Sequence, residues 1–295
     1  MRLLVTGATG FLGSHLVKKF LNDGHDIVIL KRSFSDTYRI KEVIDQIQSY
    51  DIDQCDLEQP FRDNDRFDAV IHTATSYGRK GESVQEVFKS NTEFPLQLLE
   101  LATFFNTNTF FNTDTILYKY LNSYALSKKQ FMEWGKKFAS MEKIRFINIK
   151  LEHMYGPKDN ETKFTTYVIR SCLANVPDLR LTLGEQKRDF IYIDDVISAY
   201  QVLLAKTGKL LDYFQEYELG TGHPISIKMF VETAHAITQS KTRLNFGSLP
   251  YRENEIMKSC ADTEKMRELG WRPVIQLNDG INKMIQEEKQ SCKRS

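Results

Sequence analysis

A glycine-rich turn close to the start of the chain is the feature that most restricts the fold. The segment "RLLVTG" is an apolar run typical of a buried strand, and "GATGFLG" follows it directly. Beyond the turn, Leu12, Leu16 and Phe20 recur with the period of a helix, and "HDIVILKRS" then predicts a second strand. A strand, a helix and a strand within about 30 residues form a βαβ unit, so the chain is expected to begin with two parallel strands.

The glycines of this turn are spaced as in turns that bind phosphate. Gly7, Gly10 and Gly13 let backbone amides and the start of the helix approach a pyrophosphate without obstruction by a Cβ atom. A glycine pattern alone is a weak signal, but this one follows a strand and opens a helix, which is the context that a dinucleotide site requires. We therefore predict a dinucleotide-binding turn, with a tight turn that binds no ligand as the alternative.

Further along the chain, predicted strands and helices alternate. Strands are expected within residues 67–74, 107–113 and 144–152, separated by helical patterns. This alternation implies a parallel sheet with helices on both faces. One helix is predicted from Ser83 to Phe105, and Asn91 falls inside its apolar stripe, where a buried amide needs a hydrogen-bonding partner.

The pattern changes near residue 156, where helical segments are no longer separated by regular strands. We predict an α/β protein with a Rossmann-type, doubly wound parallel sheet at residues 1–155. A smaller, mainly helical lobe that binds the substrate is expected at residues 156–295. Part of this second segment should return to the sheet.

The residues after the second strand bear on the choice of cofactor. This place faces the adenosine ribose in a dinucleotide fold, and here it holds Lys31, Arg32 and Ser33. A guanidinium can pair with a 2′-phosphate, whereas a carboxylate would repel it. The cluster therefore favours NADPH over NAD, with a solvated basic loop beside Asp36 as the alternative.

Asp56 and Leu57 follow the short segment "IDQC". Dinucleotide folds commonly place a carboxylate here against the adenine amino group. A surface aspartate in a turn explains the same spacing equally well, so the sequence leaves both interpretations open.

A tyrosine and a lysine four residues apart form the candidate catalytic pair. Tyr124 and Lys128 lie on a predicted helix, so both side chains project from one face. An ammonium beside a phenol is expected to lower the pKa of the phenol, and the pair could exchange a proton with a carbonyl oxygen. Thr113 and Thr115, in the preceding strand, are both candidates for a hydroxyl that binds the same oxygen. If the strand continues through Thr113, alternation puts both threonines on one face, which leaves the choice open.

Composition argues against several other kinds of partner. The chain has 40 basic and 39 acidic residues, so no overall field favours nucleic acid or an anionic membrane. It has no apolar run of about 18 residues that could span a membrane. The cysteines Cys55, Cys172, Cys260 and Cys292 show neither paired metal spacing nor a disulfide framework. We therefore expect a cytoplasmic protein with no metal, no nucleic-acid partner and no membrane contact.

Together these motifs resemble the extended short-chain dehydrogenase/reductase family, which contains nucleotide-sugar epimerases, dehydratases and reductases. The resemblance covers nearly the whole chain. It rests on "GATGFLG", "VIHTAT", Asn91, "YALSK", "YGP" at residues 155–157 and "RDFIYIDDV" at residues 188–196, which occur in family order.

The resemblance implies roles around the cofactor. Tyr124 would be the acid/base, Lys128 would also hold the nicotinamide ribose, and Asn91 would have a partner near the cofactor. The full set of implied cofactor residues is Gly7, Thr9, Gly10, Phe11, Leu12, Gly13, Lys31, Arg32, Asp56, Leu57, Thr73, Ala74, Thr75, Asn91, Tyr124, Lys128 and Leu151.

The resemblance also implies that the second lobe binds a nucleotide diphosphate. Arg188 and Arg252 would bind it because two guanidinium groups can each bind phosphate oxygens in a bidentate way. The full set of implied substrate residues is Tyr77, Arg79, His153, Lys163, Phe164, Arg188, Arg252 and Glu255.

Departures from the family pattern narrow the expected activity. Lys150 stands where arginine is usual, and His153 where a substrate-binding asparagine is usual. With "LEHMYGP", "GEQKRDFIYIDDV" and "ENEIMKSCAD", these variants are similar to the group of bacterial CDP-abequose and CDP-paratose synthases. The resemblance therefore implies a 4-ketoreductase that uses NADPH to reduce a CDP-3,6-dideoxy-4-hexulose for O-antigen synthesis. The configuration at C4 stays open.

A single residue argues against elimination chemistry. Family dehydratases end this strand in Thr-Asp-Glu, where the glutamate removes a carbon-bound proton. Here Thr113 and Asp114 are present but Thr115 replaces the glutamate, and a hydroxyl is too weak a base; the role of Asp114 stays unassigned.

The remaining alternatives are a 4-epimerase that retains NAD and a non-catalytic nucleotide-binding protein. The family also implies a homodimer formed through residues 83–105 and the helix of Tyr124.

Overall fold

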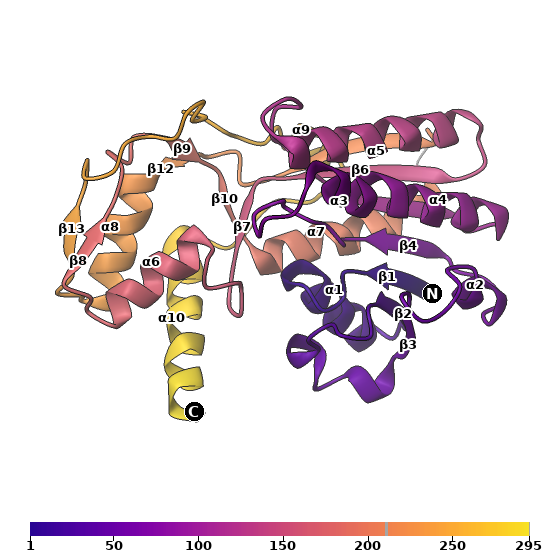
Figure 1. Cartoon of the computed structure of the whole chain (residues 1–295), viewed down its shortest axis with the longest axis horizontal. Helices are drawn as coiled ribbons and strands as arrows, with labels where there is room; N and C mark the ends of the chain where they lie inside the picture. Colours follow the sequence, from indigo (N-terminus) through magenta and orange to yellow (C-terminus); the bar gives the residue numbers. More distant parts are fainter. Residues whose placement is uncertain (210–211, 295) are drawn as a thin grey trace. The chain divides into compact units, whose positions relative to one another are not determined.

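The computed structural model describes residues 1–209 and 212–294, with side chains described as far as residue 290. Within these residues the largest sheet has seven strands, in the order β3-β2-β1-β4-β5-β6-β11 (Figure 1). The strands are β1 (Arg2–Thr6), β2 (Asp26–Lys31), β3 (Gln48–Asp51), β4 (Ala69–His72), β5 (Thr109–Thr115), β6 (Arg145–Leu151) and β11 (Phe214–Leu219). The helices along them are α1 (Phe11–Asn22), η1 (Tyr38–Ile40), η2 (Ile44–Gln46), α2 (Gln59–Arg62), α3 (Val84–Phe88), η3 (Lys89–Glu93), α4 (Phe94–Phe104), α5 (Ser123–Ser140), α7 (Ile193–Lys206) and η4 (Thr207–Lys209).

The strand order confirms the predicted doubly wound fold. The neighbouring strands from β3 to β5 pair in parallel, and the direction in which the sheet grows reverses between β1 and β4. Ligands bind such sheets beyond the carboxyl ends of the strands at this reversal. Both the glycine turn after β1 and the polar segment after β4 lie at that place.

An apolar core fixes the helices that carry the candidate catalytic residues. Helices α4 and α5 cover one face of the sheet, and α1 lies on the other (Figure 1). The core combines Leu4, Val70 and Phe110 of the sheet with Leu98 of α4 and Phe131 of α5, all of them completely buried. Burial of each such side chain stabilises the fold by about 2 kcal/mol. The start of α5 is therefore held firmly beside the end of β5.

The helix predicted from Ser83 to Phe105 is present but interrupted by a π-turn. It begins with a capping box, in which the Ser83 hydroxyl accepts from the Glu86 amide and the Glu86 carboxylate accepts from the Ser83 amide. The π-turn η3 contains the buried Asn91, and α4 then continues the helix. π-turns are rare and frequently lie at functional sites.

The chain divides into two compact units. The first contains Met1–Lys150 and Gln201–Tyr217, and the second contains Leu151–Tyr200 and Glu218–Ser295. Gln201–Tyr217 joins the first unit because β11 pairs with β6 at the edge of the sheet. The first unit thus ends at Lys150, a few residues before the boundary expected at residue 155, and Gln201–Tyr217 is the part of the later chain that lies with the sheet.

The second unit contains short strands that the sequence did not reveal. Its further elements are β7 (His153–Tyr155), α6 (Phe164–Leu173), β8 (Asp178–Arg180), β9 (Lys187–Arg188), β10 (Phe190–Tyr192), β12 (Ile225–Ser226), α8 (Ile227–Thr238), β13 (Arg243–Asn245), α9 (Glu264–Glu268) and α10 (Leu277–Arg294). The strands pair two by two, as β7 with β10, β8 with β13 and β9 with β12. Segments of two or three residues are too short to show an alternating pattern, which explains why a mainly helical lobe was expected.

Candidate functional site

The glycine turn forms a close-packed loop between β1 and α1. Gly7 has a φ of +69°, and its carbonyl accepts from the Gly10 amide at 2.9 Å. A Cβ atom on Gly13 would lie 2.2 Å from the Gly7 carbonyl oxygen, so the close approach of the helix requires glycine there. No side chain caps the start of α1 at Gly10, although Thr9, Phe11 and Leu12 surround it. The first amides of α1 are therefore suited to bind an anion.

Asn91 joins the segment after β4 to the catalytic helix. Its Nδ2 donates to the Ser76 carbonyl at 2.8 Å and to the Ser127 hydroxyl at 3.0 Å. Its Oδ1 accepts from the Ser76 amide and the Thr75 hydroxyl. The partners of this amide are thus protein groups, whereas the sequence suggested a partner at the cofactor. Thr73 is fixed in turn by the hydrogen bond from its hydroxyl to the Thr6 carbonyl at 2.8 Å.

Tyr124 and Lys128 project from the first turns of α5 into buried surroundings. Helix α5 starts at Asn122, whose side chain accepts from the Ala125 amide at 2.8 Å. Lys128 is 1% exposed, and its Nζ has no hydrogen-bond partner among the residues that the structure describes. A buried ammonium without partners is costly, so this atom indicates a place where a ligand supplies hydroxyl or phosphate oxygens. The ribose hydroxyls of a nicotinamide cofactor are suited to that place.

Burial sets the proton affinities of the pair. Burial raises the pKa of Tyr124 well above its ordinary value, and the nearby Tyr77 and Asp114 raise it further, against smaller opposing effects of Thr115 and Arg79. The prediction that the pKa of Tyr124 is lowered is therefore wrong, because burial outweighs the effect of a neighbouring ammonium. Burial lowers the pKa of Lys128 to about 8.

The two candidate threonines of β5 have different surroundings. The side chain of Thr115 is buried, its hydroxyl accepts from the Leu117 amide at 3.3 Å, and it acts on Tyr124 to lower the pKa of the phenol. Thr113 is less buried. These surroundings favour Thr115 as the hydroxyl beside Tyr124, and the choice between the two threonines stays a prediction.

A small cavity of about 200 Å³ opens beside Tyr124. It is lined by Tyr77, Gly78, Arg79, Glu82, Val84, Val87, Asn122, Ser123 and Tyr124. The rings of Tyr77 and Tyr124 lie 4.9 Å apart, and the Arg79 guanidinium lies 5.5 Å from the centre of the Tyr77 ring. The structure therefore brings the implied substrate residues Tyr77 and Arg79 together with the catalytic tyrosine.

At the adenosine end, the structure changes the interpretation of the basic cluster. Lys31 is opposite Asp51 in the register of β2 and β3, and the two form an ion pair. Ser33 hydrogen-bonds to Asp53. The Arg32 guanidinium is exposed and lies 4.8 Å from the centre of the Phe34 ring. The cationic charge of Lys31 is thus neutralised, which the sequence could not show because Asp51 is 20 residues away.

Arg39 is a further basic residue that sequence reasoning missed. Its Nη1 donates to the Thr9 carbonyl at 3.4 Å, which places the guanidinium at the glycine turn. It also lies 4.5 Å from the centre of the Tyr38 ring. No motif marks Arg39, since it lies on a single 3₁₀ turn beyond the predicted strand.

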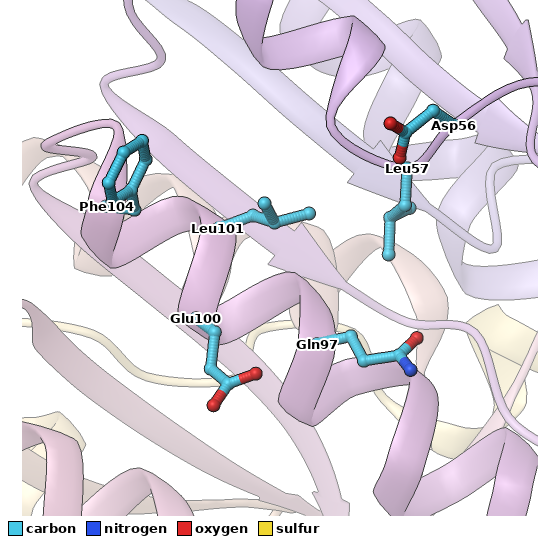
Figure 2. A pocket seen from close by; sticks show the side chains of 6 residues that line it. All are labelled: Asp56, Leu57, Gln97, Glu100, Leu101 and Phe104. Atoms are coloured by element: carbon cyan, nitrogen blue, oxygen red, sulfur yellow. The ribbon is translucent and has the colours of Figure 1, made fainter.

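Asp56 and Leu57 line a groove along α4. Figure 2 shows both residues facing Gln97 and Leu101 across an opening of about 430 Å³. The Asp56 carboxylate is largely exposed. The groove offers a carboxylate beside apolar side chains, and the adenine interpretation of Asp56 stays a prediction.

In the second unit, Arg188 and Glu255 form an ion pair. The Arg188 guanidinium also donates to the carbonyls of Lys187 and Ile256 and is 8% exposed. Arg252 is exposed and precedes this pair in a turn, in which its carbonyl accepts from the Glu255 amide at 3.1 Å. The charge of Arg188 is therefore neutralised by the Glu255 carboxylate of the protein, which the motif did not indicate.

The other residues for which the family resemblance implies a binding role lie in different local environments. His153 Nδ1 lies 3.0 Å from the buried Glu152 carboxylate, which orients the ring. The Phe164 ring lies 6.1 Å from that of Phe230 and belongs to an aromatic cluster. Lys163 is the N-terminal cap residue of α6, and Leu151 is buried at the end of β6.

The described residues contain neither a metal cluster nor a membrane-spanning helix. No group of three or more His, Cys, Asp or Glu side chains there is arranged to hold a metal ion. None of the described helices is long and apolar enough to cross a membrane. Cys55, Cys172 and Cys260 are free thiols, and the side chain of Cys292 lies outside the described part of the chain.

Comparisons with known proteins agree with this geometry. Residues 3–214 match the model of the NAD dependent epimerase/dehydratase family. A CDP-abequose synthase of Salmonella muenchen is 36% identical over 96% of this chain and 97% of its own length. A second CDP-abequose synthase, of Salmonella typhimurium, is 32% identical over the same shares. Among solved structures, a UDP-glucose 4-epimerase of Thermotoga maritima with UDP-glucose superposes with a TM-score of 0.87, covering 99% of this chain and 100% of that one, at 20% identity.

Proposed function

Because the chain belongs to the NAD dependent epimerase/dehydratase family, we propose that it is an NADPH-dependent 4-ketoreductase of a nucleotide-activated deoxysugar. The substrate would be a CDP-3,6-dideoxy-4-hexulose, and the product CDP-abequose or CDP-paratose for surface polysaccharide. Two relatives named CDP-abequose synthase match over nearly the full length of both chains, which supports this substrate class.

The observation that carries the proposal is the buried constellation at the start of α5. The side chain of Thr115 acts on Tyr124, and the Lys128 ammonium is buried without a hydrogen-bond partner among the residues that the structure describes. NADPH, when bound, supplies a hydride. Tyr124 donates its proton to the carbonyl oxygen of the sugar as that oxygen gains charge, and the Thr115 hydroxyl stabilises the same oxygen.

The raised pKa of Tyr124 suits reduction. A proton donor must carry its proton at working pH, and burial keeps the phenol of Tyr124 protonated. Lys128 would hold the nicotinamide ribose, and its positive charge favours proton release from Tyr124 once a ligand has excluded water. Elimination is disfavoured because Thr115 offers no carboxylate base.

The choice of NADPH is supported by Arg32 and Arg39. Arg32 is exposed at the end of β2, and Arg39 reaches the glycine turn. Two guanidinium groups at this end are suited to a 2′-phosphate. The remaining cofactor contacts would come from the glycine turn and from the segment after β4.

A 4-epimerase that retains NAD is the second candidate. The pairing of Lys31 with Asp51 favours it, because a lysine neutralised by a carboxylate has less charge to offer a 2′-phosphate. If the purified protein releases stoichiometric NAD on denaturation, this candidate replaces the reductase.

For the nucleotide diphosphate, we propose the implied residues of the second unit. Arg188 would exchange part of its bonding to Glu255 for phosphate oxygens, and Arg252 would add a second guanidinium. His153 is held by Glu152 with its other nitrogen available for a substrate hydroxyl or phosphate.

We also propose a cytoplasmic homodimer. Exposed apolar side chains occur on the helices that the family uses for pairing: Val84, Phe88 and Phe104 on α3 and α4, and Trp134 on α5. Pairing would remove this surface from water. Light scattering of the purified protein tests the expectation.

The decisive experiment combines the purified protein with NADPH and a CDP-3,6-dideoxy-4-hexulose. We expect one NADPH to be consumed per sugar and a 4-hydroxy product whose C4 configuration is assigned by NMR. Matched GDP-, UDP- and dTDP-sugars test the base, and the Tyr124→Phe variant is the control for enzyme-catalysed turnover. A folded protein that binds NADPH yet consumes none with any of these sugars would contradict the proposal.

A further inference from the structure

Asp114 is a buried carboxylate for which the proposed reaction has no direct use. It lies on β5 between the two threonines, and its side chain is 0% exposed. In a family site that performs elimination this position would donate a proton. Here its oxygens are already occupied by protein donors, as the contacts below describe.

The principal partner of Asp114 is Lys129, the residue after Lys128. Lys129 Nζ donates to Asp114 Oδ2 at 2.9 Å and to the Thr115 carbonyl at 2.6 Å. Asp114 Oδ1 accepts from the Thr115 amide at 2.7 Å. One lysine of α5 thus binds both the Asp114 carboxylate and the main chain of Thr115, the threonine proposed to assist Tyr124.

A hydrogen-bonded network of polar side chains on the neighbouring strands also holds the Asp114 carboxylate. Asn148 Nδ2 donates to Asp114 Oδ2 at 3.0 Å and to Glu216 at 2.9 Å. Asn112 Nδ2 donates to Asn148 Oδ1 at 2.7 Å. Lys150 pairs with Glu216 at 2.7 Å. This network joins β5, β6 and β11 and restricts the position of the Asp114 side chain.

We propose that Asp114 and Lys129 form a positioning clamp, which holds Thr115 against α5 and places a negative charge near the Lys128 ammonium. The inference rests on the proposed function, because it assumes that Tyr124, Thr115 and Lys128 perform the reduction. Lys129 is buried except for 12% of its side chain, so the clamp is largely shielded from water and from salt.

The clamp also affects the charge of Lys128. Asp114 raises the pKa of Lys128, and Lys129 lowers it, in addition to the larger effect of burial. The titratable and charged groups that face this cluster are Tyr124, Lys128 and Lys129 of α5, Glu216 of β11, Lys150 of β6 and His72 of β4. Removing either member of the clamp should therefore move the titration of Lys128, and the two removals should move it in opposite directions.

The test compares Asp114→Asn with Lys129→Gln and Lys129→Arg. Asp114→Asn keeps the shape of the side chain, and we expect it to lower kcat by about 10- to 100-fold, with the KM for NADPH within about twofold. Its activity should fall at a lower pH than that of the wild type, whereas the activity of Lys129→Gln should fall at a higher pH. Lys129→Arg retains the charge and should restore most of the activity. Lys136→Gln, in an exposed pair with Glu133 on the same helix, is the matched control and should change nothing.

A second measurement needs no sugar substrate. In protein labelled with ¹³C at the lysine ε-carbon, the Lys128 resonance is assigned by comparison with Lys128→Arg and titrated by NMR. Opposite shifts in Asp114→Asn and Lys129→Gln support the clamp even if none of the CDP-sugars is turned over. If Asp114→Asn has wild-type kcat and titration, or if both variants shift in the same direction, the clamp is refuted.

Discussion

The two ends of the proposed cofactor site differ in how far their positively charged side chains are buried. At the catalytic end, Lys128 is almost completely buried and has no protein hydrogen-bond partner among the described residues. At the adenosine end, Arg32 is exposed and stacks on Phe34, while Arg39 is half-buried at the glycine turn. A buried charge depends on each neighbour, whereas a solvated charge is compensated by water. Changes at the catalytic end should therefore affect the rate strongly, and changes at the adenosine end should mainly affect which cofactor binds.

The largest effect is expected at Tyr124. Replacing it with Phe removes the proton donor and should lower kcat by about 10³-fold, while the Kd for NADPH changes little. Steady-state kinetics and fluorescence titration of NADPH measure the two quantities. Turnover within tenfold of the wild type would show that another group supplies the proton.

The second-largest effect is expected at one of the two threonines of β5. Thr115→Val removes the hydroxyl proposed to assist Tyr124 and should lower kcat by about 10²-fold. Thr113→Val is the matched control, and its kcat should stay within about threefold of the wild type. The reverse order of effects would assign the catalytic hydroxyl to Thr113.

The pH dependence follows from Lys128. Its pKa of about 8 means that the cofactor-free enzyme loses this charge as the pH rises, so kcat/KM should fall about tenfold per pH unit well above pH 8. Stability should change in the opposite direction. Because the folded pKa lies below the ordinary 10.5, the unfolded chain binds more protons between these values, and the cost that burial of this ammonium imposes on folding decreases from pH 8 to 10.5. Activity that stays flat to pH 10 while the Lys128 resonance titrates near 8 would show that the charge is dispensable.

The smallest effects are expected at the adenosine end. Arg39→Ala should weaken NADPH binding by about tenfold and leave NADH binding unchanged, because only NADPH has the 2′-phosphate. Lys31→Gln should change either affinity by less than about threefold, since Asp51 already neutralises the lysine. Equal losses for both cofactors would place Arg39 in a structural role.

The sequence predicted the features that have local signals. The glycine turn, the alternation of strands and helices and the spacing of Tyr124 and Lys128 each depend on residues close together in the chain, and the doubly wound sheet was confirmed. The Asp51 partner of Lys31 and the Lys129 contact to Asp114 depend on strand register and helix placement instead. Such contacts join residues 15 or 20 apart and leave no periodic pattern.

The sequence also could not show which charges pair within the fold or how burial shifts the pKa of a side chain. The family resemblance implies that Arg188 binds phosphate, but only the fold shows that Glu255 already pairs with it. Likewise, the tyrosine and lysine spacing suggested a lowered pKa for Tyr124, whereas burial raises it. Burial depends on the whole core and not on neighbours along the helix.

The π-turn at Lys89–Glu93 limits how this chain can vary in length. An α-helix advances about 100° per residue, and the wider π-turn accommodates one residue more than an α-helical turn. Deleting one residue between 89 and 93 would convert the π-turn into an ordinary α-helical turn and remove the local widening that sets the direction of the Asn91 side chain. Asn91 could then no longer join Ser76 and Ser127, which it contacts from this turn. Substitutions at the exposed positions of the turn should be tolerated, but the number of residues in it is fixed by the two segments that Asn91 connects.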